Sequence, residues 1–273
     1  MFHCGKFNFD LSRPLVMGIV NVTPDSFSDG GQHASTAGAI AHAQQLIADG
    51  ADILDIGGES TRPGAATVDA QEEMDRVLPV IEGLHGVSVP ISIDTWKPEV
   101  MRAALAAGAS MVNDVNALQA AGALEAVAGS DVAVCLMHKQ GDPQTMQQRP
   151  QYQDVIAEVS AFLRRRMVAA EAAGISRDRI VIDPGFGFGK TLAHNLDLLR
   201  EMETFCAMGV PVLAGLSRKS MLGAITGRDV DDRMAASVAA AMLAVQRGAA
   251  IVRVHEVRET VDALKVWDAI NKN

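Results

Sequence analysis

Acids and an amide recur at one kind of position in this sequence, as the first polar residue after a short apolar run. Asp94, Asn113 and Asp183 each occupy such a position. Side chains of this type are costly to bury unless a partner pairs with them. Two carboxylates and an amide suit a flat heterocycle that carries several N–H donors, whereas they would repel a phosphate. The same oxygens could also ligate a metal, although the chain has no His/Cys cluster for a tightly held transition metal.

A glycine-rich loop follows Asp183 and runs Pro-Gly-Phe-Gly-Phe-Gly up to Lys190. Phe186 and Phe188 lie between glycines in a chain with only 4% aromatic residues. Glycine lets the backbone approach a flat ligand closely, and a phenyl ring offers that ligand a stacking face. Alternatively, the loop is a structural turn whose two rings pack back onto the core.

Basic residues gather late in the chain and in one early loop. Ser217-Arg-Lys-Ser220 and the pair Arg253 and His255 each come at the end of an apolar run. Arg62 suits bidentate binding of a phosphate, or it is a surface arginine without a partner. Residues 21–31 have the Asp, Ser, Gly and Pro content of a mobile lid, or of a solvated turn.

The elements that must position these groups alternate regularly along the chain. The strand candidates are 15–20, 53–56, 89–93, 111–112, 132–137, 180–182, 210–216 and 250–254, and the helix candidates are 36–48, 70–84, 98–107, 119–128, 151–173, 193–207, 231–246 and 257–270. Eight strand-then-helix units predict an α/β fold, a (β/α)8 TIM barrel, in which the carboxyl ends of all strands meet on the face that holds the active site. An open doubly wound sheet is the alternative, but the first strand lacks the nucleotide-binding fingerprint.

Length and composition agree with one soluble barrel over residues 1–273, preceded by a short hairpin in residues 1–12. Barrels of about 250 residues are common single domains. The net charge of −9 argues against nucleic acid or anionic membrane as a partner. Three cysteines without metal-ligand spacing indicate free thiols. The N-terminus has no signal-peptide pattern and Met234–Val245 is too short to span a bilayer, so we expect a cytoplasmic protein.

Several motifs together resemble one family, the dihydropteroate synthases, which are the folate-pathway enzymes that sulfonamides inhibit. The resemblance covers nearly the whole chain. Each motif is short, but their common order makes chance resemblance very improbable. The motifs are Gly18-Ile-Val-Asn-Val-Thr-Pro-Asp-Ser-Phe-Ser-Asp-Gly30, Asp55-Ile-Gly-Gly-Glu-Ser-Thr-Arg-Pro-Gly64, Ser92-Ile-Asp-Thr95, Asn113-Asp114, Asp183-Pro-Gly-Phe-Gly-Phe-Gly-Lys190, Ser217-Arg-Lys-Ser220 and Arg253-Val-His255.

The resemblance implies a reaction and a role for each motif. The family joins 6-hydroxymethyl-7,8-dihydropterin pyrophosphate to p-aminobenzoate and releases pyrophosphate. It implies Asp94, Asn113, Met137, Asp183 and Lys219 for the pterin; Asn21, Thr61, Arg62, Arg253 and His255 for the pyrophosphate; Phe27, Pro63, Phe188, Lys219 and Ser220 for p-aminobenzoate; Asn21 as a ligand of Mg²⁺; and Asp94, Asp183, Lys219 and Arg253 as the catalytic set. It also implies a homodimer formed through late helices, which agrees with the apolar segment 234–245.

Three other functions compete with this interpretation. A pterin-binding methyltransferase barrel that acts on methyltetrahydrofolate would lack the 217–220 motif and the 23–27 loop, both present here. A non-catalytic pterin-binding protein would not need anion, metal and lid positions together. A phosphosugar isomerase or aldolase would need a base or a Schiff-base lysine beside a carbonyl. Trp96, directly after the 92–95 motif, has no assigned role.

Overall fold

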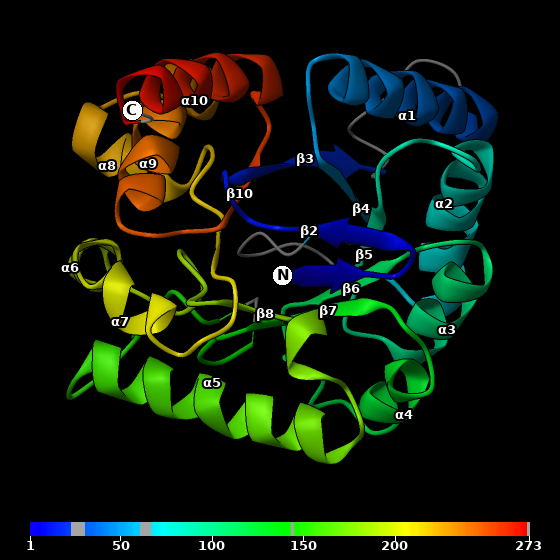
Figure 1. Cartoon of the computed structure of the whole chain (residues 1–273), viewed down its shortest axis with the longest axis horizontal. Coiled ribbons are helices and arrows are strands. Elements are labelled where there is room, and N and C mark those ends of the chain that lie inside the picture. Colours follow the sequence, from blue (N-terminus) through cyan, green and yellow to red (C-terminus); the bar gives the residue numbers. More distant parts are fainter. Residues whose placement is uncertain (23–30, 61–66, 143–144, 272–273) are drawn as a thin grey trace.

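The fold is described from a computed structural model in which residues 1–22, 31–60, 67–142 and 145–271 are placed. Eight parallel strands form the central sheet (Figure 1). Their bounds are β3 Leu15–Asn21, β4 Ile53–Gly57, β5 Ile91–Asp94, β6 Met111–Asp114, β7 Ala133–Met137, β8 Ile180–Asp183, β9 Leu213–Ala214 and β10 Ile251–Val254. Each of the eight strand candidates therefore contains or overlaps an observed strand.

The strand order β8-β7-β6-β5-β4-β3-β10-β9 brings the first barrel strand beside the last one. β3 pairs with β10 from Leu15↔Ile251 onward. The remaining seam, between β8 and β9, is joined by one parallel bridge, Ile182↔Val212, and by the Ile182 N–H, which donates to Pro211 O at 3.0 Å. The predicted (β/α)8 barrel is confirmed, with its thinnest closure next to Asp183.

Helices surround the strands, as the alternating pattern predicts (Figure 1). Their bounds are α1 Gly31–Ala48, α2 Ala70–Gly83, α3 Pro98–Ala106, α4 Ala123–Ala128, α5 Val155–Ala172, α6 Leu192–Arg200, α7 Met202–Cys206, α8 Ser220–Thr226, α9 Met234–Gln246 and α10 Val257–Asn271. The helix expected over 193–207 is two helices that meet at Glu201. The helix expected from 151 begins only at Val155, because the Asp154 carboxylate accepts from the N–H groups of Ile156 and Ala157 and so caps it.

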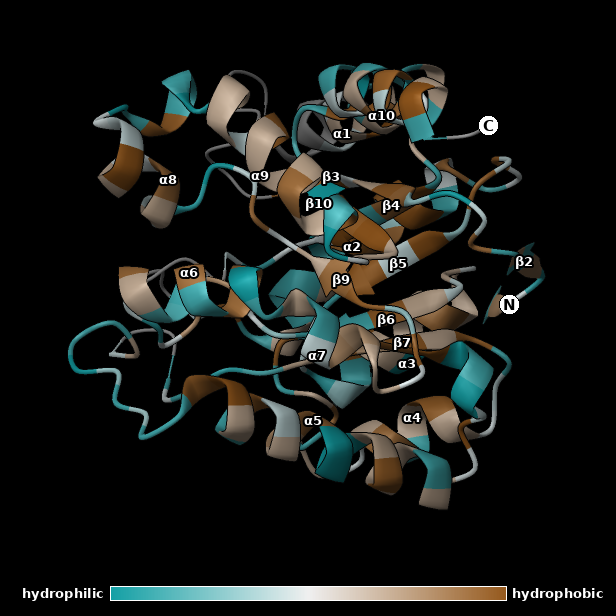
Figure 2. Ribbon diagram, turned by 60° about the vertical axis from the view of Figure 1, so that its left-hand side comes forward, coloured by the Kyte–Doolittle hydropathy of each residue, from teal (hydrophilic) through white to brown (hydrophobic). Residues whose placement is uncertain are grey.

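Side chains inside the barrel change character along each strand. Successive residues of a strand point to opposite faces, so residues two apart share the inner face. Ile53, Met111, Val181 and Ile251 belong to one buried apolar cluster at the amino ends of their strands. Two residues later, toward the carboxyl ends, stand Asp55, Asn113, Asp183 and Arg253. The barrel thus has an apolar lower interior and a polar mouth; Figure 2 shows the apolar character of β4 and β5.

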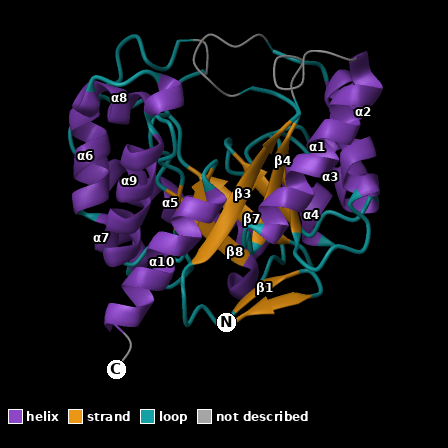
Figure 3. Cartoon of the chain, turned by 90° about the horizontal axis from the view of Figure 1, so that it is seen from above, coloured by secondary structure: helices purple, strands orange, loops and turns teal. Residues whose placement is uncertain are grey.

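The predicted N-terminal hairpin covers the amino end of the barrel. β1 Phe2–Cys4 pairs antiparallel with β2 Phe7–Phe9. Phe2 and Cys4 are fully buried in the same cluster as the lower interior of the barrel. The Gly5 N–H donates to Asp131 O at 3.2 Å, which ties the turn to the segment before β7. Figure 3 shows the hairpin at the end of the barrel away from the arrowheads of β3 and β4.

Among the described residues, no helix has both the length and the apolar content needed to cross a membrane.

Candidate active site

Arg253 lies at the centre of the polar mouth, between two carboxylates. Its Nε donates to Asp55 Oδ2 at 2.5 Å and its Nη2 donates to Asp94 Oδ2 at 2.7 Å. These contacts join three strands, because Asp55 is on β4, Asp94 ends β5 and Arg253 is on β10. One guanidinium thus serves two carboxylates.

Asn113 adds a fourth member, and several acceptors of the group remain available to a ligand. Its Nδ2 donates to Asp55 Oδ2 at 3.0 Å. The outer oxygens Asp55 Oδ1 and Asp94 Oδ1, and the hydroxyl of Ser92, are buried without a hydrogen-bond partner among the described residues. Buried acceptors of this kind are costly unless a donor reaches them. The mouth therefore suits a ligand rich in N–H groups.

Electrostatics at Asp94 and Arg253 follow from this crowding. Burial raises the pKa of Asp94 to about 7, with Arg253 opposing and the carboxylate of Asp55 adding to the rise. The same two carboxylates raise the pKa of Arg253, against the opposing effect of its burial. A small change in the charge of the mouth, such as the arrival of a ligand, therefore changes the protonation of Asp94 near neutral pH.

Asp183 and Lys219 form the second part of the mouth. Asp183 is 6% exposed, and its Oδ1 accepts from the Gly185 N–H at 2.6 Å. Burial raises the pKa of Asp183, while Lys219 opposes this effect. Burial also lowers the pKa of Lys219 to about 8, against the attraction of Asp183. Met137 lies beside Asp183 on the neighbouring strand and is 4% exposed.

The two phenylalanines of the glycine-rich loop have different surroundings. Phe186 is fully buried in the core, as the structural alternative predicts for both rings. Phe188 is half-buried, and Lys219 Nζ lies 4.3 Å from the centroid of its ring while donating to Phe186 O. Only Phe188 is therefore placed to meet a ligand, beside a cation that it attracts through its ring face.

His255 lies in a hydrogen-bonded group that links the ends of the last two barrel strands. Ser217 Oγ lies 2.8 Å from His255 Nδ1 and donates to Glu256 Oε2 at 2.9 Å. A hydroxyl carries one hydrogen, so the Nδ1 of His255 donates to Ser217 in this arrangement. Arg218 Nε donates to the other oxygen of Glu256 at 2.6 Å. His255 therefore has a fixed ring orientation at the mouth.

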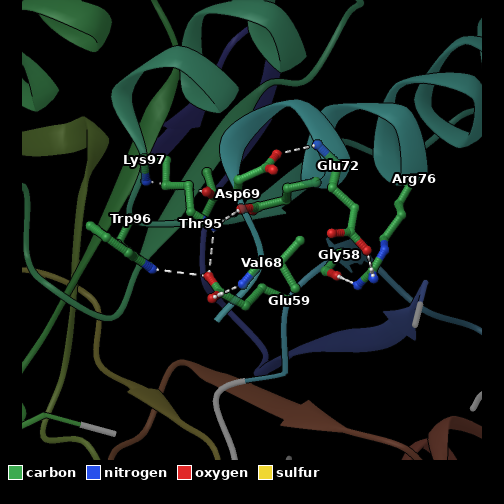
Figure 4. A network of polar contacts seen from close by, with 10 residues as sticks. Gly58, Glu59, Val68, Asp69, Glu72, Arg76, Thr95, Trp96 and Lys97 are labelled. Carbon is green, nitrogen blue, oxygen red and sulfur yellow. Dashed lines mark hydrogen bonds and ion pairs between the residues drawn. The ribbon is translucent and has the colours of Figure 1, made fainter. Parts of the chain in front are cut away.

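Trp96 belongs to a network of polar contacts around Glu59 (Figure 4). Glu59 Oε2 accepts from Trp96 Nε1 at 3.0 Å and from Lys97 Nζ at 2.8 Å, and Glu59 Oε1 accepts from the Val68 N–H at 3.0 Å. Lys97 also pairs with Glu73 Oε2 at 2.5 Å. The network fixes Glu59 and Val68, which lie before and after the predicted pyrophosphate-binding residues in the sequence.

Other predicted site residues are placed less centrally, or lie outside the described ranges. Asn21 ends β3 and is half-buried beside Gly57. Ser220 is exposed as the first residue of α8. Phe27, Thr61, Arg62 and Pro63 lie outside the residues that the structure describes.

Two central residues received no role from the sequence. Asp55 is fully buried and contacts both Arg253 and Asn113. The sequence did contain a signal for Asp55, because an acid between Leu54 and Ile56 in an apolar strand is unusual. Lys190 is 3% exposed and binds loop carbonyls, for which the sequence offers no distinct signal.

Comparisons with known proteins agree with this site. A family described as "Pterin binding enzyme" matches residues 17–255. The dihydropteroate synthase of Escherichia coli strain K12 is 50% identical over 263 residues, which cover 96% of this chain and 93% of that protein. The dihydropteroate synthase of Neisseria meningitidis serogroup C is 52% identical over 278 residues, which cover 100% of this chain and 98% of that protein. A structure of Xanthomonas albilineans dihydropteroate synthase with 4-aminobenzoic acid has a TM-score of 0.91 and 57% identity. The match covers 96% of this chain and 95% of that one. A structure of Burkholderia cenocepacia dihydropteroate synthase complexed with 7,8-dihydropteroate has a TM-score of 0.91 and 50% identity. The match covers 98% of this chain and 95% of that one.

Proposed function

Because this chain belongs to the pterin-binding enzyme family, and within it to the dihydropteroate synthases, we propose that it makes 7,8-dihydropteroate. The substrates are 6-hydroxymethyl-7,8-dihydropterin pyrophosphate and p-aminobenzoate, and the second product is pyrophosphate. The observation that carries the proposal is the group of buried acceptors at the mouth, formed by Asp55, Asp94, Asn113 and Asp183. A pterin carries amino and ring N–H donors along its edges, and these donors match such acceptors.

The position of the acceptors supports a pterin bound inside the mouth and an amine bound outside it. Asp94 and Asn113 are on the neighbouring strands β5 and β6, and Asp183 is on β8, with only β7 between β6 and β8. In this proposal the three side chains hold the ring, with Met137 and Lys219 beside it. Phe188 then provides the stacking face for p-aminobenzoate next to Lys219. Ser220, exposed at the start of α8, lies one residue beyond Lys219 and completes this outer pocket with the predicted Phe27 and Pro63.

The pyrophosphate requires positive charge, and Mg²⁺ is the ion that the family implies. Mg²⁺ prefers oxygen ligands and commonly takes several of them from substrate phosphates and water. The described residues contain no cluster of three His, Cys, Asp or Glu that could hold a metal alone. Asn21 offers one amide oxygen at the end of β3, which fits an ion delivered with the pyrophosphate. When bound, Mg²⁺ would neutralise charge on the departing pyrophosphate. Arg253, His255, Thr61 and Arg62 supply the remaining contacts in this proposal.

We infer a dissociative reaction. The bond between the pterin methylene carbon and the pyrophosphate oxygen breaks, and its electron pair leaves with the pyrophosphate. The carboxylates of Asp94 and Asp183 stabilise the positive charge that develops on the pterin. The amine nitrogen of p-aminobenzoate then forms the new C–N bond and loses a proton to solvent. Lys219 acts by position and charge, because no carbonyl substrate calls for a covalent amine. A borohydride-stable adduct on Lys219 would contradict this mechanism.

The test is direct measurement of product by chromatography, with both substrates, with and without Mg²⁺. We expect turnover that requires Mg²⁺ and falls at least about 100-fold in Asp183→Asn and in Lys219→Ala. Lys265→Met is the control, since Lys265 is exposed on α10, and it should keep full activity. Folded protein that binds the pterin without turnover would favour a binding protein. Binding of methyltetrahydrofolate with loss of pterin pyrophosphate binding would favour the methyltransferase.

We propose that the protein is a homodimer through its last helices. Apolar side chains are exposed on this side of the chain: Ile225, Val230, Met234 and Leu243 in or near α8 and α9, and Val266 and Ile270 in α10. Exposed apolar groups of this kind are typical of a contact between copies. Light scattering at micromolar concentration should give twice the mass of 28.9 kDa, and a monomeric mass would contradict the proposal.

We also propose a cytoplasmic location, which its thiols support. Cys4, Cys135 and Cys206 are all free, and burial raises the pKa of Cys4 to about 12. Free thiols are usual in a reducing compartment. When the source cells are fractionated, we expect the protein in the lysate fraction that is free of membranes.

A further inference from the structure

The glycine-rich loop between β8 and α6 is held by side chains at five consecutive carbonyl groups. All five carbonyls from Gly185 to Gly189 accept a hydrogen bond from a side-chain donor. Gly185 O and Phe188 O accept from Lys190, Phe186 O from Lys219, Gly187 O from Gln147 and Gly189 O from Tyr152. Four side chains therefore determine the shape of this loop: Lys190 from the loop itself, Gln147 and Tyr152 from the segment before α5, and Lys219 from the segment before α8.

The loop needs such support because its backbone has little intrinsic preference. Gly185, Gly187 and Gly189 all have positive φ, of 73°, 79° and 62°. A Cβ at Gly185 would lie 1.8 Å from His138 O, and one at Gly189 would lie 2.3 Å from Gln140 O. Glycine is therefore required at both positions, and glycine loses the most conformational freedom on folding. Side-chain contacts to the loop must offset that loss.

Lys190 is the central donor of this arrangement. Its Nζ lies 2.8 Å from Gly185 O, 3.1 Å from Phe188 O, 3.3 Å from His138 O and 3.0 Å from His138 Nδ1. The side chain is 3% exposed, so protein atoms replace its water. Burial lowers the pKa of Lys190 to about 7, against the attraction of Asp183, so its Nζ carries two or three hydrogens near neutral pH. These four atoms surround it in either form, so one side chain connects the start, the end and the neighbour of the loop.

His138 takes part as a neutral acceptor. Burial and the positive charge of Lys190 lower the pKa of His138 to about 3. The imidazole is therefore neutral at neutral pH, and its Nδ1 accepts from Lys190 when its one ring proton is on Nε2. The edge of its ring packs against Phe162 at 4.9 Å between centroids, which holds the imidazole in place. The His138 N–H donates to Asp183 O at 3.0 Å, so this residue also connects the loop support to the end of β8.

The loop in turn positions two groups of the mouth. Lys219 donates to Phe186 O and lies over the ring of Phe188, and Asp183 accepts from the Gly185 N–H. We propose that Lys190 is a positioning residue for the p-aminobenzoate side of the site, acting through the loop to place Phe188 and Lys219. This inference rests on the proposed function. The pterin acceptors Asp94 and Asn113 are on barrel strands and do not depend on the loop. Asp183 and Lys219 serve the pterin too, but Asp183 is also fixed by its strand pairing with Met137. The pterin therefore depends on the loop less than p-aminobenzoate does, whose stacking ring Phe188 lies within it.

The experiment compares Lys190→Met with wild type and with Lys265→Met as the exposed-lysine control. Methionine keeps the length and apolar stem of the side chain and removes the donors. We expect the KM for p-aminobenzoate to rise about tenfold or more, while the dissociation constant for the pterin pyrophosphate changes less than about threefold. Hydrogen–deuterium exchange of the peptide spanning 184–192 should accelerate, while peptides of β3 to β6 stay unchanged.

A milder variant keeps the test decisive if Lys190→Met does not fold. Tyr152→Phe removes only the donor to Gly189 O, so it should raise the KM for p-aminobenzoate a few-fold and accelerate exchange in the same peptide. A normal KM for p-aminobenzoate despite faster exchange would overturn the inference. An equal rise in the KM for p-aminobenzoate and in the dissociation constant for the pterin pyrophosphate, together with faster exchange in the strands, would also overturn the inference. That result would indicate general destabilisation of the protein. Wild-type protein without turnover would count against the proposed function alone, because the exchange measurement would still decide whether Lys190 holds the loop.

Discussion

Two carboxylates share the single guanidinium of Arg253 at the mouth, and at the scale of residues this sharing controls the chemistry. Asp55 accepts from both Arg253 and Asn113 through one oxygen. It therefore orients a cation and an amide that are both predicted to contact substrate. Asp55 acts through these neighbours and also presents its second oxygen to the mouth.

We expect Asp55→Asn to lower kcat/KM for the pterin substrate by roughly 10- to 100-fold, because a hydrogen bond to a charged group is worth about 1.5–3 kcal/mol. The amide keeps the size of the side chain but removes its charge, so Arg253 is then paired only with Asp94. Steady-state kinetics measure this effect. Asp52→Asn is the control, because Asp52 lies before β4 and pairs with Arg13, away from the mouth. Kinetics of Asp55→Asn equal to those of the control would contradict the role.

The raised pKa of Asp94 predicts how stability depends on pH. Its native pKa of about 7 lies above the ordinary value of 3.8, so the native state binds this proton more strongly than the unfolded state does. The stabilisation is complete below about pH 4 and is lost as the pH rises through 7. Asp94→Asn should therefore gain stability relative to wild type between pH 5 and pH 8, on the order of 1–3 kcal/mol. Urea denaturation at both pH values measures the difference. A constant difference would contradict the raised pKa.

Sequence reasoning located Asp94, Asn113 and Asp183 because each is the first polar residue after an apolar run, and the structure places all three at the mouth. It did not locate Asp55, which lies inside a strand rather than at its end. The residue pattern alone also could not tell Phe186 from Phe188, since the two differ only in where a loop of glycines turns them, although the resemblance assigned a ligand to Phe188 only. That turn depends on donors such as Gln147, Tyr152 and Lys219, which come from distant parts of the chain.

Among the elements, Glu59 after β4 and Val68 before α2 are held by a buried network of charges. Lys97 pairs with Glu59 and with Glu73, and Glu73 is fully buried with its Oε1 lacking a partner among the described residues. Trp96, which had no role at first, donates to the same Glu59. The indole and the lysine together hold the carboxylate that receives the Val68 N–H.

We expect Lys97→Met to destabilise the protein by about 3–5 kcal/mol, because it leaves a buried carboxylate unpaired. The double variant Lys97→Met with Glu73→Gln should recover a large part of that loss, since the buried charge is then also removed. Chemical denaturation measures both, with Lys265→Met as the exposed control. A double variant as unstable as the single one would show that Lys97 contributes by packing and not by charge.

Element existence was predictable from the sequence, while element ends were not. All eight strand candidates were recognisable because apolar runs recur at the spacing of β/α units. The split between α6 and α7 at Glu201 escaped the pattern, since both halves keep an apolar face and no proline or glycine marks the break. Packing against the barrel decides such a break, and single-segment patterns do not contain it.

For the whole molecule, the division between an apolar lower interior and a polar mouth separates stability from activity. Phe2→Ala should cost about 3–5 kcal/mol of unfolding free energy, because Phe2 is fully buried beneath the barrel. The KM values should stay at wild-type levels, since the hairpin lies at the end opposite the mouth. Asn8→Ala, exposed in the same hairpin, is the matched control for both measurements. Raised KM values in stable, folded Phe2→Ala would contradict this separation.

The pairing of Arg253 with Asp55 and Asp94 spans 198 and 159 positions of the chain. A ribosome makes the two acids long before it makes their cation. Until β10 is synthesised, Asp55 and Asp94 have no guanidinium to pair with, and β3 lacks the strand that pairs with it on that side. The last barrel strand to be synthesised, β10, therefore both closes the barrel and supplies the cation of the active site. A translation product that ends before β10 lacks the closed barrel and the paired charges.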